Sequence, residues 1–288
     1  MAGVAAILAA VGCGGRAKPP QQNGPIAARA AGGVAVVSPD GKRKRLIHAQ
    51  VAGWLQWASP RSRIGNEHGI VRGRHFGVVQ VLGAGDGRRL VLSQALYAAW
   101  SPDGRTVAFA RDVCPSDDCG TPAGGSSIEL FTARFDGRHL RRLTRNGSYD
   151  GEPDWSPDGK RLVYATDDGL RIMNADGSHV RPLTLGAYHQ QPRWSPDGRR
   201  VVFDSALDVF VVDVKTRRVR KLAANPGPDR DAAWSPDGRF IVYLSEHVCR
   251  ICFSAEDPLE LWVMRADGTR AHRLVRGRGY TEPDWAPR

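Results

Sequence analysis

The chain has 288 residues, of which 41% are apolar, and its formal net charge is +11. That length and apolar content are sufficient for a substantial buried core, and 33 glycines with 19 prolines indicate the frequent tight turns of an all-β chain. We expect no second, catalytic domain, because the repeats described below take up most of the length.

Residues 1–13 form a short run of apolar and small residues that ends at Cys13. The run is too short to span a bilayer as a helix, and it is similar to a bacterial lipoprotein signal, which implies export and lipidation of Cys13. A disordered cytosolic N-terminus is the alternative. Residues 14–33, rich in Gly, Ala, Pro and Gln, predict a flexible tether. We therefore expect a membrane-anchored lipoprotein in the periplasm or at the cell surface.

The pentapeptide Trp-Ser-Pro-Asp-Gly recurs through the remainder of the chain. Four copies are complete, and two divergent copies flank them. Their tryptophans are Trp57, Trp100, Trp155, Trp194, Trp234 and Trp285. A period of about 40 to 50 residues indicates an array in which each repeat is one supersecondary unit.

Each repeat reads as a four-stranded antiparallel meander. Pro, Asp and Gly of the pentapeptide suit a type I turn that ends in a residue with positive φ, and the segment after it alternates apolar and polar residues as a strand does. A second hairpin follows, at residues 34–47, 78–92, 128–144, 170–184, 209–222 and 259–275. The sequence therefore predicts a six-bladed β-propeller over residues 34–288, closed by the C-terminal strand joining the N-terminal hairpin.

Trp-Ser-Pro-Asp-Gly is followed by segments such as residues 172–184, which read Ile-Met-Asn-Ala-Asp-Gly, three residues, and Arg-Pro-Leu-Thr. In these two features the repeat resembles the WD-like repeat of the TolB propeller family. The resemblance covers residues 34–288 and does not include the N-terminal α/β domain of TolB. It implies the propeller fold, but the same repeat also occurs in propellers of prolyl oligopeptidase-type proteases.

Candidate binding residues precede each tryptophan, in the long connections that enter the Trp strand. Acids and amides stand three residues before Trp, and acids and aromatics stand near them. The candidate residues of this expected channel mouth are Tyr149, Asp150, Glu152, His189, Gln191, Asp229, Asp231, Tyr280 and Glu282. The structural alternative is that each acid accepts hydrogen bonds within its own repeat. A cation site is a further alternative.

Two long insertions contain the remaining cysteines, as the close pairs Cys114 with Cys119 and Cys249 with Cys252. In an exported protein such pairs predict two local disulfides. Zinc binding by His247, Cys249 and Cys252 is the alternative, and thiol redox catalysis is a weaker one.

No nucleophile elbow, zinc-protease motif or phosphate-binding glycine loop occurs in the sequence. The leading interpretation is a non-enzymatic module, expected to be monomeric and without a cofactor, that binds a protein or an anionic envelope polymer. Basic residues alternate with aliphatic ones on expected exposed strands, which favours solvated edges over nucleic-acid binding. The alternatives are a lyase or hydrolase with a site at the channel mouth, and an orphan relative of a protease propeller.

Overall fold

The computed structural model describes the repeats and part of the segment before them. The described residues are 23–30, 33–48, 55–59, 62–71, 74–83, 89–93, 95–113, 127–134, 136–222, 228–245, 260–275 and 280–285. Cys13 and the four paired cysteines lie outside these ranges, so the anchor and the disulfides stay predictions.

The described strands form four-stranded antiparallel sheets, six in all. From the inner strand outward, the first three are β24 (Thr281–Trp285), β1 (Ile26–Ala30), β2 (Gly33–Val37) and β3 (Lys44–His48); β4 (Leu55–Ser59), β5 (Ser62–Val71), β6 (Arg74–Gly83) and β7 (Arg89–Ser93); and β8 (Ala95–Trp100), β9 (Thr106–Asp112), β10 (Ile128–Arg134) and β11 (Arg141–Arg142). The other three are β12 (Asp150–Trp155), β13 (Arg161–Thr166), β14 (Gly169–Asn174) and β15 (Arg181–Pro182); β16 (Gln190–Trp194), β17 (Arg200–Ser205), β18 (Asp208–Asp213) and β19 (Val219–Lys221); and β20 (Asp229–Trp234), β21 (Phe240–Ser245), β22 (Glu260–Arg265) and β23 (His272–Val275).

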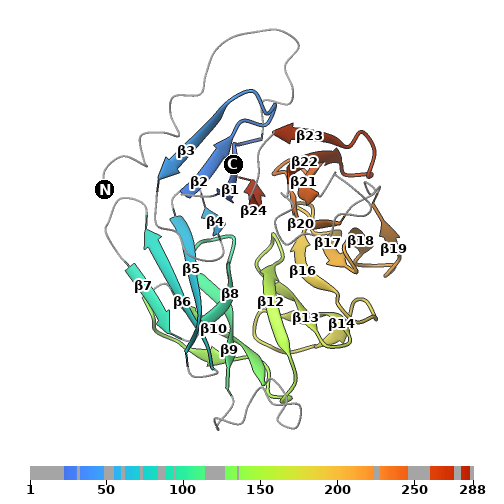
Figure 1. Ribbon diagram of the computed structural model, residues 1–288. Coiled ribbons are helices and arrows are strands. Elements are labelled where there is room, and N and C mark those ends of the chain that lie inside the picture. The colour runs from blue at the N-terminus through green and yellow to red at the C-terminus, as the bar shows by residue number, and fades with distance from the viewer. Residues whose placement is uncertain are drawn as a thin grey trace.

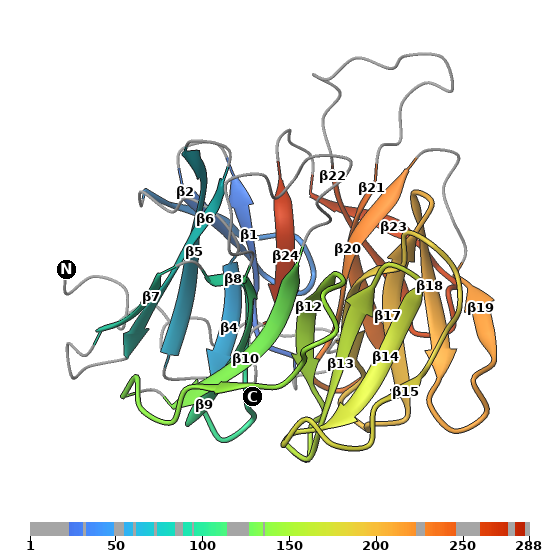
Figure 2. The same ribbon diagram turned by 90° about the horizontal axis from the view of Figure 1, so that it is seen from below.

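The sheets are arranged radially, with the strands β4, β8, β12, β16, β20 and β24 around a common axis (Figure 1). The strands run between two faces of the molecule (Figure 2). Because successive strands are antiparallel, the pentapeptide turns and the outer hairpin turns lie on one face, which we call the corner face. The connections between sheets lie on the other, which we call the loop face.

Each pentapeptide turn is closed by a serine–aspartate network. Ser156 Oγ donates to Asp158 Oδ1 (2.6 Å), and the same carboxylate oxygen accepts the Lys160 N–H (3.1 Å). Gly159 completes the turn with φ = 68°, a value that favours glycine. The equivalent Ser–Asp hydrogen bonds, of 2.6–2.7 Å, are Ser101–Asp103, Ser195–Asp197 and Ser235–Asp237. Ser38 and Asp40 form the same bond (2.6 Å) in the outer hairpin turn between β2 and β3.

The repeat tryptophans pack between neighbouring sheets. Trp155 is buried with Ala99 of β8 and Leu162 of β13, and its Nε1–H donates to the Ala99 carbonyl (3.1 Å). Trp234 makes the equivalent bond to the Arg193 carbonyl (3.2 Å). Side-chain packing is described for five of the sheets, and in β4–β7 only for Leu92. At Trp155 and Trp234 the indole therefore joins consecutive blades through both apolar contact and a hydrogen bond.

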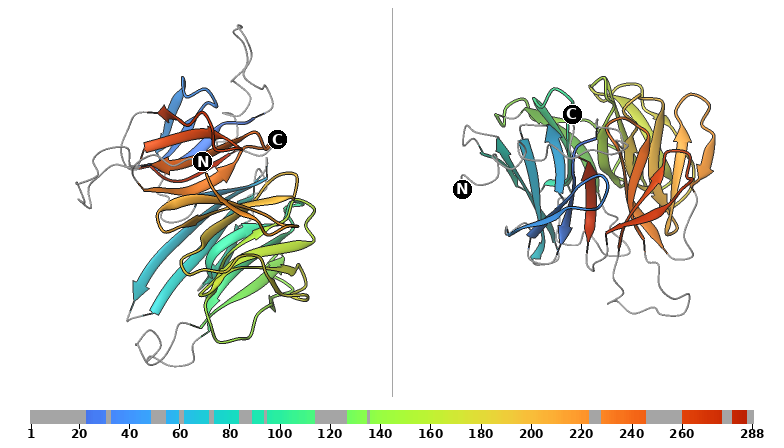
Figure 3. Two further views of the ribbon diagram at one scale, coloured as in Figure 1. Left: turned by 90° about the vertical axis from the view of Figure 1, so that its right-hand side faces the viewer. Right: turned by 90° about the horizontal axis from the view of Figure 1, so that it is seen from above.

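The predicted fold class, a six-bladed propeller closed by the C-terminal strand joining the N-terminal hairpin, needs correction. The chain is an all-β propeller, but β24 does not pair with the hairpin β2–β3. It pairs with β1, which lies between them and belongs to residues that the sequence predicts as tether; Ile26 stands opposite Trp285. Figures 1 and 3 both place β1 beside β24. Ile26, Ala27 and Ala28 are buried, and the strand contains only one large apolar residue, Ile26, among its alanines.

Basic residues occupy the outer strands, as expected, and several pair with an acid on the neighbouring strand. The pairs are Glu129–Arg142 (3.2 Å), Asp208–Lys221 (2.7 Å) and Glu260–Arg273 (3.0 Å). Other basic residues of the outer strands and their hairpins are exposed, among them Arg141, Arg218 and Arg220.

Within the described residues, the structure has no helix with the length and apolar character of a membrane span.

Candidate functional site

An irregularity recurs three residues before the tryptophan in four inner strands. The strand pairing shifts at this position, and the residue there adopts a left-handed conformation although it is not glycine. These residues are Tyr97 (φ 50°), Glu152 (φ 53°), Gln191 (φ 51°) and Asp231 (φ 57°). The left-handed conformation is energetically unfavourable for residues other than glycine. Because it recurs at the same position in four blades, we infer that the fold holds these side chains in a defined orientation.

Glu152 contacts groups of two blades. Its carboxylate accepts the backbone N–H of Gln191 in the next blade (2.5 Å) and lies 3.4 Å from the Tyr149 hydroxyl. Burial raises the pKa of Glu152, against the backbone hydrogen bond from Gln191 and the positive charge of Arg193. Glu152 therefore has one partner in its own blade and one in the next blade.

Two further carboxylates, which were not among the predicted site residues, also connect neighbouring blades. Asp154 accepts the Trp194 N–H (2.7 Å), and burial raises its pKa to about 6. Asp204 on β17 accepts the Asp231 N–H (2.6 Å). Burial and the nearby Asp231 carboxylate raise the pKa of Asp204 well above its ordinary value. The inner strands are thus connected by carboxylates that accept main-chain N–H groups.

The predicted residues five positions before the tryptophan lie between blades. Asp150, Asp229 and Tyr280 are each at most 1% exposed. His189 Nδ1 lies 2.8 Å from the Thr184 hydroxyl, and its ring packs on Phe203 at 4.8 Å between centroids. Burial lowers the pKa of His189, which favours the neutral imidazole. The contacts with Thr184 and Phe203 hold the His189 ring in place.

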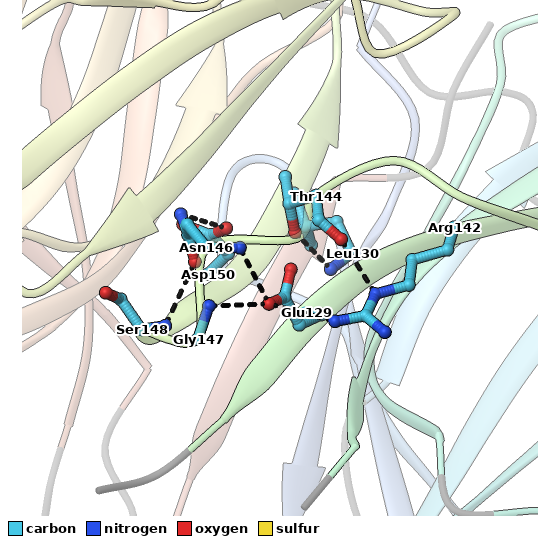
Figure 4. Close-up of polar contacts among 8 residues, drawn as sticks. All are labelled: Glu129, Leu130, Arg142, Thr144, Asn146, Gly147, Ser148 and Asp150. Carbon is cyan, nitrogen blue, oxygen red and sulfur yellow. Dashed lines mark hydrogen bonds and ion pairs between the residues drawn. The ribbon is translucent and has the colours of Figure 1, made fainter.

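Asp150 belongs to a polar cluster at the start of β12 (Figure 4). Asn146 Nδ2 donates to its carboxylate (2.9 Å). Glu129 Oε1 accepts the N–H groups of Asn146 (3.0 Å) and Gly147 (2.9 Å) and pairs with Arg142. Burial raises the pKa of Asp150 to about 6, and the Glu129 carboxylate adds to the rise. The cluster fixes the connection between two blades.

Three large apolar side chains on the loop face are exposed. Leu185 (78%) and Tyr188 (75%) lie in the connection into β16, and Leu207 (57%) lies in the turn between β17 and β18. Their segments are held in place, since the Gly186 N–H donates to the Asp168 carbonyl (2.9 Å) and the Asp229 N–H donates to the Leu207 carbonyl (2.8 Å). We call these three residues the loop-face apolar set.

The structure brings part of the predicted site together and leaves part of it undescribed. Glu152, Gln191 and Asp231 occupy equivalent positions on adjacent inner strands. Glu282 lies in β24 and Trp57 in β4, but their side chains are not described.

Tyr97 was missed by the sequence-based prediction, although its spacing to Trp100 could have identified it. Asp204 could have been noticed as an acid in an apolar strand. Among the described residues, no group of three or more His, Cys, Asp or Glu side chains is placed to hold a metal ion.

Comparison with known proteins identifies the repeat. Residues 92–207 match the family model of the TolB beta propeller domain. The Tol-Pal system protein TolB of Anaeromyxobacter dehalogenans (strain 2CP-C) is 34% identical over 107 residues, which covers 35% of this chain and 22% of that protein. Dipeptidyl-peptidase 5 of Porphyromonas gingivalis is 32% identical over 80 residues, covering 28% of this chain and 11% of that protein. The chain therefore spans less than a quarter of these relatives' lengths.

Solved structures share the fold. TolB from Acinetobacter baumannii has a TM-score of 0.69 at 20% identity, covering 92% of this chain and 67% of the other. A putative TolB from Agrobacterium tumefaciens has a TM-score of 0.66 at 21% identity, covering 91% and 92%. An oligogalacturonate lyase in complex with manganese has a TM-score of 0.55 at 15% identity, covering 85% and 70%. Likeness at these identities concerns the fold alone.

Proposed function

We propose that this propeller, whose repeats are similar to those of TolB, is a non-enzymatic module that binds another protein through its loop face. The observation that supports this most directly is the loop-face apolar set, in which three large side chains are more than half exposed. Exposed apolar side chains on a rigid scaffold are typical of protein-binding surfaces.

The polar residues of the inner strands form the second part of the proposed surface. Tyr149, Gln191 and Asp231, which are partly exposed, lie in the blade of the apolar set or in the blades beside it. Glu152 is buried and accepts the Gln191 N–H, and the predicted Glu282 extends the series to β24. An apolar surface beside carboxylates suits a partner segment that combines apolar side chains with Lys or Arg. An anionic envelope polymer is the other partner class, and it would be repelled by these carboxylates.

The proposed location is the cell envelope. A Tol-Pal system protein is among the relatives, and the N-terminal segment of this chain is similar to a lipoprotein signal. We propose export, with Cys13 as the lipid attachment site and the propeller in the periplasm or at the cell surface.

The test compares two matched triple variants in capture from an envelope extract. Leu185→Ser, Tyr188→Ser and Leu207→Ser change the loop face, whereas Leu140→Ser, Val180→Ser and Val219→Ser change exposed apolar residues at the other end of the blades. We expect the captured protein to be retained by the second variant and lost by the first. Calorimetry with the purified partner should show an affinity at least roughly tenfold weaker for the loop-face variant, because anchor residues contribute most of the binding energy.

Equal affinities of the two variants for the purified partner would refute the loop-face assignment. Glu152→Gln and Asp231→Asn in one chain test the polar part separately, since these changes remove charge and keep size. An unchanged affinity in that variant would remove the carboxylates from the proposed surface.

A further inference from the structure

The corner face has its own row of exposed apolar side chains. Leu140 (51%), Val180 (46%) and Val219 (43%) occupy the same position in the outer hairpins of three consecutive blades, just after the turn and before or at the start of the outer strand. We call these residues the rim row. Repetition of an exposed aliphatic residue at one position produces a line along the edge of the molecule rather than scattered single residues.

Basic residues flank every member of the rim row. Leu140 stands between His139 and Arg141, Val180 precedes Arg181, and Val219 stands between Arg218 and Arg220. In the hairpins 134–142 and 213–221 the basic residues outnumber the single acid. These acids are engaged by their own turns: Asp136 accepts the Arg138 N–H (2.9 Å), and Asp213 accepts N–H groups of Lys215 and Thr216.

Like charges gather where two of these hairpins meet. Partial burial and the positive charges of Arg217 and Arg161 lower the pKa of Arg181. Arg161 is also positioned by the Trp194 ring, 4.8 Å from its centroid. A cluster of guanidinium groups in neighbouring blades costs electrostatic energy in the free protein, and an anionic surface would relieve that cost.

The described N-terminal segment begins at this same face. Ile26 pairs with Trp285 at the corner end of β24, and the Asn23 side chain accepts the Asp237 N–H (3.2 Å) in a pentapeptide turn. Cys13 precedes Asn23 by about ten residues, a reach of at most about 35 Å when extended. Lipidation at Cys13 would therefore hold the corner face, rather than the loop face, close to a bilayer.

We propose that the rim row and its arginines dock on the surface of an anionic phospholipid membrane. The guanidinium groups would contact lipid phosphates while the aliphatic side chains enter the boundary between headgroups and acyl chains, as in other interfacial surfaces. The loop face would then point away from the bilayer and remain open to a protein. This orientation goes beyond the proposed protein binding and does not depend on it.

Vesicle sedimentation tests the proposal with the full chain carrying Cys13→Ser, so that no lipid anchor contributes. The vesicles contain phosphatidylcholine alone or mixed with phosphatidylglycerol. We expect binding to the anionic vesicles and its loss at high salt. Arg181→Gln with Arg217→Gln should weaken binding about 25-fold, at about fivefold for each charge removed. Leu140→Ser, Val180→Ser and Val219→Ser together should weaken it roughly tenfold.

The loop-face variant, Leu185→Ser, Tyr188→Ser and Leu207→Ser, is the matched control and should bind the vesicles as the parent chain does. Thermal unfolding of every variant within about 2 °C of the parent verifies that the fold is kept, as expected for surface substitutions. The proposal is overturned if both vesicle types bind equally, if the loop-face variant loses as much binding as the rim variant, or if the chain binds duplex DNA but not anionic vesicles.

Discussion

Replacing Trp155 with alanine is expected to lower the free energy of unfolding by about 3–5 kcal/mol, the cost of removing a large aromatic side chain from a core. Trp155 is 8% exposed and packs between the blades of β8–β11 and β12–β15, and its indole N–H donates to the Ala99 carbonyl. The change would leave a cavity at the contact between two blades and an unpaired carbonyl. Urea unfolding should show a lower midpoint with the slope nearly unchanged.

Trp155→Phe separates the two contributions. Phenylalanine keeps most of the apolar contact and loses the N–H donor, so we expect a smaller cost of about 1–2 kcal/mol. The surface change Leu185→Ala should stay within about 0.5 kcal/mol. A loss below about 1 kcal/mol for Trp155→Ala would show that these blades are not coupled through the indole.

Replacing Asp204 with asparagine is expected to stabilise the protein at neutral and alkaline pH. The folded-state pKa of Asp204 is raised well above its ordinary value of 3.8 by burial and by Asp231, with Glu152 adding to the rise. The parent chain therefore loses stability as pH rises from about 4 toward that raised pKa. Asparagine is uncharged, so its burial carries no cost of ionisation, and its side-chain carbonyl can still accept the Asp231 N–H. We therefore expect the variant to be more stable than the parent chain at pH 8, where the parent must keep this buried carboxylate charged.

Thermal unfolding between pH 4 and pH 8 measures this effect. The difference between parent and variant should vanish near pH 4 and grow with pH. Asp158→Asn is a control of opposite sign, because hydrogen bonds from Ser156 and Lys160 lower the pKa of Asp158. Its carboxylate stabilises the fold above the unfolded-state pKa, so the variant should be less stable at pH 7 and approach the parent below about pH 3. A pH-independent difference for Asp204→Asn would show that this carboxyl group does not titrate with a raised pKa.

The two faces of the propeller differ in construction, which allows two separate roles. The corner face consists of short turns closed by Ser–Asp pairs, with basic residues and the rim row at its edge. The loop face carries longer connections and the loop-face apolar set, beside the buried carboxylates of the inner strands. The triple variants of the two faces should therefore have opposite effects in the partner and vesicle experiments.

The candidate site was predictable only in part. Counting three residues back from each tryptophan identified Glu152, Gln191 and Asp231, because equivalent positions in a repeat occupy equivalent places around the axis. Their left-handed conformation and the bonds of Glu152 to the next blade were not predictable, since they depend on how adjacent sheets meet. Asp204 was missed because its partner, the Asp231 N–H, is on another blade.

The sequence by itself determined the repeat, the pentapeptide turns and the position of each hairpin, because these depend on interactions within a few residues: Ser156, Asp158 and Gly159 close their turn among themselves. Only the tertiary structure decided that Ile26–Ala30 is a strand between β24 and β2. Three alanines, an arginine and a single isoleucine have the composition of a tether. They form a strand here because two neighbouring strands supply hydrogen-bond partners, and Ile26, Ala27 and Ala28 are buried. Contacts between segments far apart in the chain likewise decided which carboxylates join the blades.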